Sequence, residues 1–482
     1  MTTWEAVIGL ETHVELQTDS KMFCGCPVAF GDEPNTSICP VCLGLPGALP
    51  VPNEEAIEGI LSVGAALDCT LTESSLFYRK NYFYPDLPKN FQISQYTFPL
   101  CVDGHLDVDV DGESVHIGIT RVHMEEDTGK SLHIGGGGRI QEAEHTLLDF
   151  NRAGVPLVEI VTEPDIRSAD QARAYGAELQ RLVRSLGVSD ARLEEGSMRF
   201  DANVSIRPAG STELGTRTEV KNVNSLRSLQ RAVLFEIERQ IGVVEAGDTV
   251  HLETRHWNED TGVTKGMRSK EESEDYRYFQ EPDLLPLHID LAWQERVRDS
   301  LPELPSRLRE RLLAEGVDPT ATEVMVASPE LAEVHGRAVA AGADPRSSAL
   351  WITGEVVAYL RRQEVAIGDT GLTGERVAQL AAMVADGALS ATAAKEVMAG
   401  VLAGEGDPKD VAEARDLLQI SDEGALQEAI ASVLLENEDA LEKLRTGDMK
   451  PLGFLVGQVM KATGGKADPK IVQEILRREA SG

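Results

Sequence analysis

The chain has 482 residues and a mass of 52.3 kDa, with 42% hydrophobic and 26% charged residues. This composition is ordinary for a folded protein, and at roughly 100–200 residues per domain the length predicts two to four domains. The net charge of −34 argues against generic nucleic-acid binding, because phosphate contacts require basic surface. No run of 18 apolar residues and no signal-peptide pattern is present, so we expect a cytoplasmic protein without membrane contact.

The composition changes near residue 300, after which only one of the ten histidines and none of the six cysteines occur. The first part contains short alternating runs broken by Gly, Pro, Asn and Asp, whereas the remainder has apolar residues at helical spacing. The predicted fold class is α+β, with a mainly antiparallel sheet domain over 1–294, an all-α helical domain over 295–405 and a helical tail over 406–482. Within the first domain we expect helices over 169–186, capped by Asp165 or Ser168, and over 225–241.

The first predicted strand covers residues 7–16 and has two distinct faces. Its aliphatic residues alternate with Glu11, His13 and Glu15, and side chains on a strand repeat with a period of two. Metal-competent groups on one face are typical of half a site for a hard cation. The alternative is the solvent-exposed face of an edge strand.

Two more segments place acidic residues together. The segment HMEEDTGKS contains Glu125, Glu126 and Asp127, which either face water or hold a cation. It is not a phosphate-binding loop, because Met124 stands where that motif requires glycine. In the next predicted strand, Glu159 lies among apolar residues, and a buried carboxylate is costly unless it is paired, protonated or bound to a cation. A metal ligand and a buried ion-pair partner both remain open for Glu159. The intervening glycines 135–138 are expected at a hairpin tip.

The segment EEGSMRFDANVSIRP reads as a strand with one apolar and one polar face. Its polar face carries Arg199, Asp201 and Asn203, a row that suits a phosphate and its magnesium ion. The next strand places Glu219 and Lys221 on one face. Two neighbouring strands with polar faces predict the floor of a cleft.

Residues 77–96 form an aromatic and basic segment without glycine, which we interpret as a loop. Lys80 and Lys89 stand among tyrosines and phenylalanines, including Tyr82. Aromatic rings interleaved with cations can stack a base and hold phosphates. An ordinary aromatic cluster packed over the sheet is the alternative.

The cysteines follow a specific pattern. Cys24 and Cys26 form a CxC pair, and Cys39 and Cys42 form a CxxC pair twelve residues later. Two close pairs of thiols in a cytoplasmic chain predict a tetrahedral structural zinc site, with free thiols as the alternative.

The C-terminal segment differs in charge from the rest of the chain. Residues 441–482 contain eight Lys or Arg and five acidic residues, a net charge of +3. A local basic patch decides nucleic-acid contact more than the total charge does. A solvated helix pair is the alternative.

Several long motifs resemble one known family. These are IGLETHVEL, YRKNYFYPDLPKNFQISQY, HMEEDTGKS, FNRAGVPLVEIVTEPD, GSMRFDANVSIRP, TEVKNVNS, DYRYFQEPDLLPL and LGFLVGQVMKATGGKADP. Together they resemble the B subunit of the tRNA-dependent amidotransferase, GatB of the GatCAB complex. The motifs occur in order along essentially the whole chain. The sequence contains no Ser-Lys amidase signature and no GxSxG motif, which agrees with a polypeptide that performs no acyl-enzyme chemistry.

The resemblance implies a reaction and a set of partners. In this family, GatB transfers the γ-phosphoryl group of ATP to the side-chain carboxylate of misacylated Glu-tRNA(Gln) or Asp-tRNA(Asn). Ammonia, released from glutamine by the amidase (A) component, then displaces the phosphate. A heterotrimer with the A and C components is implied, as is a cradle domain followed by a helical domain and a tail similar to YqeY.

The resemblance also implies roles for individual residues. The magnesium ligands would be Glu11, His13, Glu126 and Glu159, where the local sequence alone cannot separate Glu125 from Glu126. The catalytic residues would be Lys80, Arg199, Asp201 and Asn203. The residues that contact ATP or substrate would be Tyr82, Lys89, Ser94 and Lys221. The tail would contact tRNA through Lys461, Lys466 and Lys470. Because some family members lack the four cysteines, the zinc ion would be structural.

Two other classes of function stay open on the sequence. A non-catalytic tRNA-binding scaffold would explain the basic tail but not the acidic strand faces. A free-standing metal-dependent ligase acting on a small carboxylate would explain the cleft but not the tail.

Overall fold

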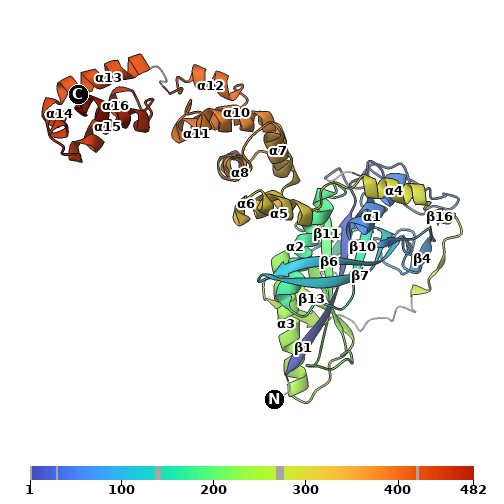
Figure 1. Ribbon diagram of the computed structural model, residues 1–482. Helices are drawn as coiled ribbons and strands as arrows, with labels where there is room; N and C mark the ends of the chain where they lie inside the picture. Colours follow the sequence, from blue (N-terminus) through green and yellow to red (C-terminus); the bar gives the residue numbers. More distant parts are fainter. Residues whose placement is uncertain (1–2, 29–30, 136–142, 267–275, 420–422, 482) are drawn as a thin grey trace. The chain divides into compact units, whose positions relative to one another are not determined.

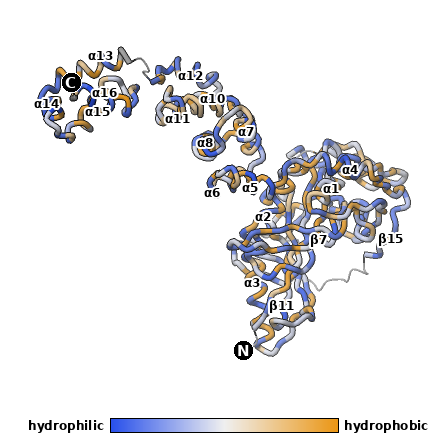
Figure 2. Tube along the Cα trace, in the orientation of Figure 1, coloured by the Kyte–Doolittle hydropathy of each residue, from blue (hydrophilic) through white to orange (hydrophobic). Residues whose placement is uncertain are grey.

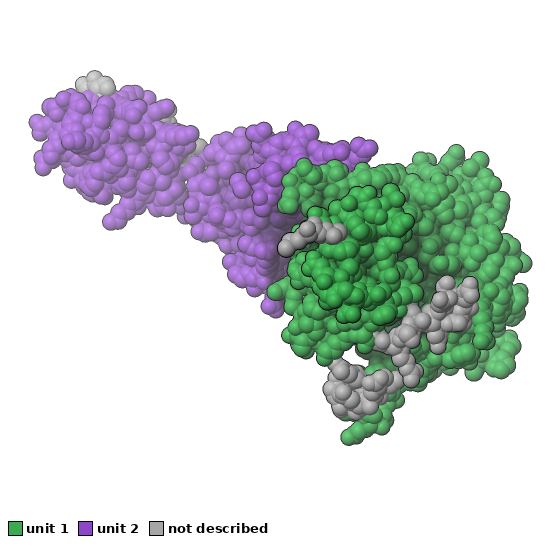
Figure 3. Space-filling model, turned by 90° about the horizontal axis from the view of Figure 1, so that it is seen from below, with its two compact units in different colours: residues 1–305 green, residues 306–482 purple. Residues whose placement is uncertain are grey.

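The computed structural model describes residues 3–28, 31–135, 143–266, 276–419 and 423–481 (Figure 1). The chain divides into two compact units, residues 1–305 and 306–482 (Figure 3). The first unit is rich in sheet and the second is helical, so the predicted α+β class is confirmed. The finer division at residues 294 and 405 stays a prediction.

The first unit contains a sheet of nine strands. In the order in which they lie side by side, the strands are β14 (Val263–Gly266), β13 (Glu253–Asn258), β12 (Thr218–Val223), β11 (Met198–Pro208), β1 (Trp4–Glu15), β10 (Pro156–Thr162), β7 (Glu113–Glu126), β6 (Cys101–Val110) and β2 (Thr70–Leu71). Strands β12 and β13 pair in parallel, and the other neighbouring pairs of this described sheet are antiparallel. An antiparallel sheet can bury one face and leave the other polar, which the alternating strands predicted.

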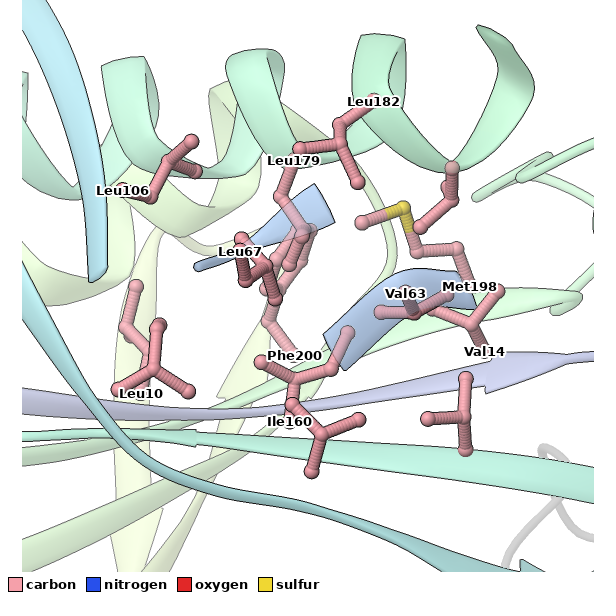
Figure 4. Close-up of a cluster of buried hydrophobic side chains, with 14 of the residues drawn as sticks. Leu10, Val14, Val63, Leu67, Leu106, Ile160, Leu179, Leu182, Met198 and Phe200 are labelled. Atoms are coloured by element: carbon pink, nitrogen blue, oxygen red, sulfur yellow. The ribbon is translucent and has the colours of Figure 1, made fainter. Parts of the chain in front are cut away.

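Helices pack on the apolar face of this sheet: α1 (Glu54–Ala66), α2 (Ala169–Ser185) and α3 (Leu226–Glu245). In Figure 4, Leu179 and Leu182 of α2 lie over Phe200 of β11 and Leu10 of β1, all of them buried. The Ser168 side chain caps α2 by accepting a hydrogen bond from the backbone N–H of Gln171. Helix α3 extends four residues beyond its predicted end.

Smaller strands form three separate pairings beside the main sheet. They are β4 (Tyr78–Asn81) with β5 (Phe91–Ser94) and β15 (Phe279–Gln280), β3 (Ser74–Ser75) with β16 (Leu287–His288), and β8 (Lys130–Ile134) with β9 (His145–Asp149). The loop predicted over residues 77–96 is therefore wrong, because this segment forms a hairpin. Its ordering partner β15 lies far away in sequence, where Glu281 accepts a hydrogen bond of 2.6 Å from Arg79. Residues 136–138 of the predicted hairpin tip lie outside the described residues.

Helix α4 (Leu291–Asp299) packs on α1 and closes the first unit. The second unit is built from amphipathic helices, and Figure 2 shows hydrophobic and hydrophilic residues interspersed along them. These helices are α5 (Pro305–Ala314), α6 (Pro319–Val326), α7 (Pro329–Ala340), α8 (Pro345–Trp351), α9 (Val357–Gln363), α10 (Gly374–Ala385), α11 (Ala391–Leu402), α12 (Pro408–Ala414), α13 (Glu423–Glu436), α14 (Glu438–Arg445), α15 (Lys450–Ala462) and α16 (Pro469–Ser481).

Two apolar clusters account for most of the second unit. One joins α7 to α12 and includes Val411 and Ala412, which lie beyond the predicted boundary at residue 405. The other joins α13 to α16 around Leu455 and Leu476. Among the described residues, no helix has the length and apolar character needed to cross a bilayer.

Candidate active site

The register of three central strands places polar side chains together on the open face of the sheet. His13 of β1 pairs with Glu159 of β10 on one side and with Arg199 of β11 on the other. Glu11 pairs with Asp201 in the same way. Residues opposite one another in an antiparallel pair have Cβ atoms about 4.5–5.5 Å apart, so these side chains are neighbours. The prediction that β1 and β11 carry polar residues on one face agrees with the burial of their alternate residues.

One group of potential metal ligands consists of His13, Glu125 and Glu159. Its three ligand atoms lie within 4.8 Å of one another. His13 Nε2 lies 3.9 Å from Glu159 Oε2 and 4.0 Å from Glu125 Oε2. Burial lowers the pKa of His13 and so keeps its imidazole neutral. Burial opposes ionisation of Glu159, but His123 and the other nearby cationic groups lower its pKa well below the usual range. A neutral imidazole beside ionised carboxylates is a suitable environment for a divalent cation.

A second group consists of Glu11, Asp201 and Glu219, whose ligand atoms also lie within 4.8 Å of one another. Asn203 Nδ2 donates a hydrogen bond of 3.0 Å to Glu11 Oε1, and Lys221 Nζ lies 2.6 Å from Asp201 Oδ2. Burial, followed by repulsion from the neighbouring carboxylates, raises the pKa of Glu11. This shift means that the nearby cations do not balance the local negative charge, and a bound cation would relieve the imbalance.

The β4–β5 hairpin approaches these groups with two lysines. Lys80 Nζ lies 3.2 Å from Glu125 Oε1, which links the hairpin to the first group. Lys89 forms an ion pair with Glu126, whose Oε1 also accepts a hydrogen bond of 2.8 Å from the backbone N–H of Ile93. The structure therefore brings Glu125 to His13, and it places Glu126 with the hairpin instead. Consecutive strand residues point to opposite sides, so this difference of one residue changes which carboxylate can reach the cation.

Arg199 and Asp127 form the edge of the site. Arg199 Nη1 lies 3.4 Å and Arg152 Nε lies 3.5 Å from Asp127 Oδ2. Burial would raise the pKa of Asp127, but the two guanidinium groups lower it to about 2. Burial and the charge of Asp127 raise the pKa of Glu15 to about 8, so Glu15 carries a proton near neutral pH. Asp127 was not among the predicted site residues, although the acidic run in HMEEDTGKS marked its position.

Tyrosines form a wall beside Lys80. The ring centroids of Tyr96 and Tyr278 lie 5.4 Å apart, and those of Tyr82 and Tyr276 lie 6.0 Å apart. Lys80 Nζ lies 5.5 Å from the Tyr276 ring centroid. Tyr276 and Tyr278 were missed as individual site residues, although the motif DYRYFQEPDLLPL contained both.

Ser94 has a local structural contact within the hairpin. Its side chain is buried, and its Oγ accepts a hydrogen bond of 3.2 Å from the backbone N–H of Tyr96. A pocket of about 240 Å³ lies on the other side of the site, where Glu11, Asn203 and Arg217 line it together with the backbone at Gly9. The open sheet face is thus bordered by the tyrosine wall and by this pocket.

The four cysteines of the two predicted pairs meet at one point. Their Sγ atoms lie within 4.8 Å of one another, and the Cys39 and Cys42 sulfurs are 3.9 Å apart. Thiolates bound to one tetrahedral zinc lie roughly 3.8 Å apart, so the cluster fits one ion with little movement. Hydrogen bonding from Cys24 is the main cause that lowers the pKa of Cys42 to about 5. Cys69 and Cys101 are buried elsewhere.

The three predicted tRNA-contacting lysines lie in the last two helices and the turn between them. Lys461 and Lys470 are exposed. Lys466 is half-buried and forms an ion pair with Asp416. Two of the three are therefore fully open to solvent.

Two family models match the chain. Residues 6–295 match the GatB/GatE catalytic domain and residues 334–479 match the GatB domain. The class of protein is therefore one with a GatB-type catalytic domain followed by a GatB C-terminal domain.

Relatives along the whole length define the family more closely. Proteins from Nocardioides sp., Thermobifida fusca and Frankia casuarinae are 50%, 51% and 52% identical to the chain. The matches cover 98–99% of this chain and 93–97% of each relative, and each relative bears the name of the GatB component of an aspartyl/glutamyl-tRNA(Asn/Gln) amidotransferase. The chain belongs to this GatB family of amidotransferase components, which confirms the resemblance and the prediction of an enzyme component.

Proposed function

We propose that the chain is the ATP-dependent component of an enzyme that amidates Glu-tRNA(Gln) and Asp-tRNA(Asn). A carboxylate oxygen of the misacylated amino acid attacks the γ-phosphorus of ATP, and ADP leaves. Ammonia then attacks the carbonyl carbon of the acyl phosphate and phosphate leaves, which gives the side-chain amide. The observation that carries this proposal is the pair of acidic groups around His13 and Glu11, bordered by Lys80 and Lys221.

Magnesium fits these groups because their donors are mainly carboxylate oxygens. His13, Glu125 and Glu159 would hold one ion, and Glu11 with Asp201 would hold a second. When bound, magnesium supplies positive charge to the phosphate oxygens of the nucleotide. The raised pKa of Glu11 supports this assignment, since it reports negative charge that the described side chains leave uncompensated.

The side chains of the chain itself would solve an electrostatic problem. The nucleotide and the amino-acid carboxylate are both anions, and phosphoryl transfer between them needs positioning and positive charge. Lys80 and Lys221 would contribute that charge, and Arg199 would add to it from the edge. Asn203 would orient Glu11 through its hydrogen bond. The tyrosine wall would exclude water, which competes with ammonia for the activated carbonyl.

The further assignments extend beyond this face of the sheet. The amidase (A) component would supply ammonia from glutamine, and the A and C components would complete a heterotrimer. Lys461, Lys466 and Lys470 would contact the tRNA backbone. The cysteine cluster would hold a structural zinc ion. Because aminoacyl-tRNA is used in the cytoplasm, we place the reaction there.

The test uses the heterotrimer, misacylated tRNA, glutamine and Mg·ATP. The Glu11→Gln change should lower amidation at least 100-fold while glutamine hydrolysis by the amidase component continues. Glu55→Gln is the matched control, since Glu55 is an exposed residue in the first turn of α1. Full amidation by Glu11→Gln would contradict the proposal.

The same assay separates the alternatives. ATP hydrolysis that depends on misacylated tRNA supports the proposal. A tRNA-binding scaffold would bind tRNA without turning over ATP. A ligase for a small carboxylate would turn over ATP without tRNA.

A further inference from the structure

A cluster of two imidazoles and a carboxylate lies on the hairpin of β6 and β7, the two long strands that run side by side in Figure 1. His116 and Asp107 are register partners, and His116 Nδ1 lies 2.7 Å from Asp107 Oδ1. His105 lies two residues from Asp107 on the same face. Its register partner is Gly118, which has no side chain to separate the two rings. The ring centroids of His105 and His116 are 4.8 Å apart, with the rings tilted by 30°.

A second carboxylate approaches from the end of α1. The backbone N–H of His105 donates a hydrogen bond of 2.8 Å to the carbonyl oxygen of Leu67, which ties the strand to the helix end. The next residue, Asp68, has a positive φ of 53°. Its Oδ2 lies 3.7 Å from His105 Nε2. Two imidazoles and two carboxylates from three elements therefore surround one small volume.

We propose that His105, Asp107 and His116 form a binding site for a late transition-metal ion, with Asp68 as an additional oxygen donor. One ligand atom from each of the first three residues lies within 4.8 Å of the others. Imidazole nitrogen suits Zn²⁺, Ni²⁺ and Cu²⁺, whereas Mg²⁺ prefers oxygen ligands. The donor set thus differs from the carboxylate-rich groups on the open sheet face and from the four thiols of the cysteine cluster.

The backbone around this cluster favours coordination. Three of the donors stand on paired strands, where positions are more precise than on loops. His116 and Asp107 are more than half exposed, at 66% and 54% of their side-chain surface, so an ion can enter from solvent. A bound ion would link the β6–β7 hairpin to the end of α1 through Asp68. A simple ion pair between His116 and Asp107 would not recruit His105.

The test is a calorimetric titration of the full-length chain with Ni²⁺, with zinc preloaded on the cysteines and millimolar Mg²⁺ present to fill the carboxylate groups. We expect one equivalent of Ni²⁺ to bind in a step that the His105→Ala/His116→Ala double variant loses. Each single variant should weaken that step at least tenfold. His251→Ala is the matched control, because His251 is an exposed histidine outside the cluster.

Hydrogen exchange provides a second measurement. Ni²⁺ should slow exchange of the β6–β7 amides and of the last turn of α1 in the wild-type chain, and not in the double variant. Binding of the same stoichiometry and affinity in the double variant would overturn the proposal. Unchanged exchange in these segments at saturating Ni²⁺ would also overturn it.

Discussion

His13 and Glu159 are direct register partners in the antiparallel pairing of β1 and β10, and their side chains meet with Nε2 and Oε2 3.9 Å apart. His123, from the neighbouring strand β7, lies 3.2 Å from the same carboxylate oxygen. Glu159 thus stands between two imidazoles on three adjacent strands. The carboxylate that looked costly in an apolar strand lies at the centre of the site.

Replacing Glu159 with glutamine should remove the central negative charge of the first group. We expect amidation to fall about 100-fold, which corresponds to about 2.7 kcal/mol of transition-state stabilisation. The measurement is the amidation rate of the heterotrimer at saturating ATP, with a thermal melt to verify folding. Activity within threefold of wild type in a folded variant would contradict the metal assignment.

Glu125 and Glu126 should differ in their effect on magnesium. Glu125 lies beside His13, so Glu125→Gln should raise the Mg²⁺ concentration needed for half-maximal ATP turnover at least tenfold. Glu126 pairs with Lys89 and the Ile93 N–H, so Glu126→Gln should leave that concentration within about twofold. Magnesium titrations of the two variants compare the carboxylates directly. The reverse pattern would favour the assignment that the family resemblance suggested.

Loss of one cysteine should empty the metal cluster. Because a tetrahedral thiolate site needs all four ligands and its binding energy stabilises the fold, Cys42→Ser should reduce bound zinc from about one equivalent to below 0.2 and lower the melting temperature. Cys69→Ser is the control, since Cys69 lies outside the cluster. Elemental analysis after gel filtration gives the metal content. Full zinc occupancy in Cys42→Ser would refute the assignment.

The exposed lysines of the tail should act on tRNA alone. Lys461→Glu and Lys470→Glu should each weaken tRNA binding and reduce the salt dependence of the affinity by about one unit of slope. Lys395→Glu, outside the tail, is the control. Binding isotherms at several salt concentrations provide both numbers. Equal affinity and slope in the double variant would remove these residues from the tRNA contact.

The stability of the second unit should depend on pH through His335. This side chain is fully buried, with Nδ1 3.1 Å from Ser348 Oγ and Nε2 3.9 Å from Glu315 Oε2. Burial lowers its pKa, with the charge of Arg311 acting in the same direction and that of Glu315 opposing it. The unfolded chain therefore takes up a proton near pH 6.5 that the folded unit does not hold.

The sign follows from that difference. Stability contributed by neutral His335 is present above about pH 6.5 and is lost as the pH falls through the lower folded pKa. We expect the melting temperature of this unit to decrease from pH 7.5 to pH 5.5, and to decrease less in His335→Gln. Thermal melts at both pH values test this expectation. An equal pH dependence in the two proteins would assign the effect to other groups.

Local periodicity predicted the two faces of β1 and β11, because alternation within a strand needs no knowledge of its neighbours. It could not decide between Glu125 and Glu126, since that choice depends on how the end of β7 meets the β4–β5 hairpin. The same limit explains the wrong loop over residues 77–96. Its ordering partner β15 is distant in sequence, and no local pattern predicts that pairing.

The alternation along β1 has a consequence for how this protein can change. Leu10 and Val14 are buried in the core, while Glu11 and His13 alternate with them on the opposite face. A slip of one residue would turn the ligands inward and the aliphatic side chains outward. The chemistry and the hydrophobic core are therefore set by a single alignment of this strand, and an insertion within it would disable both at once.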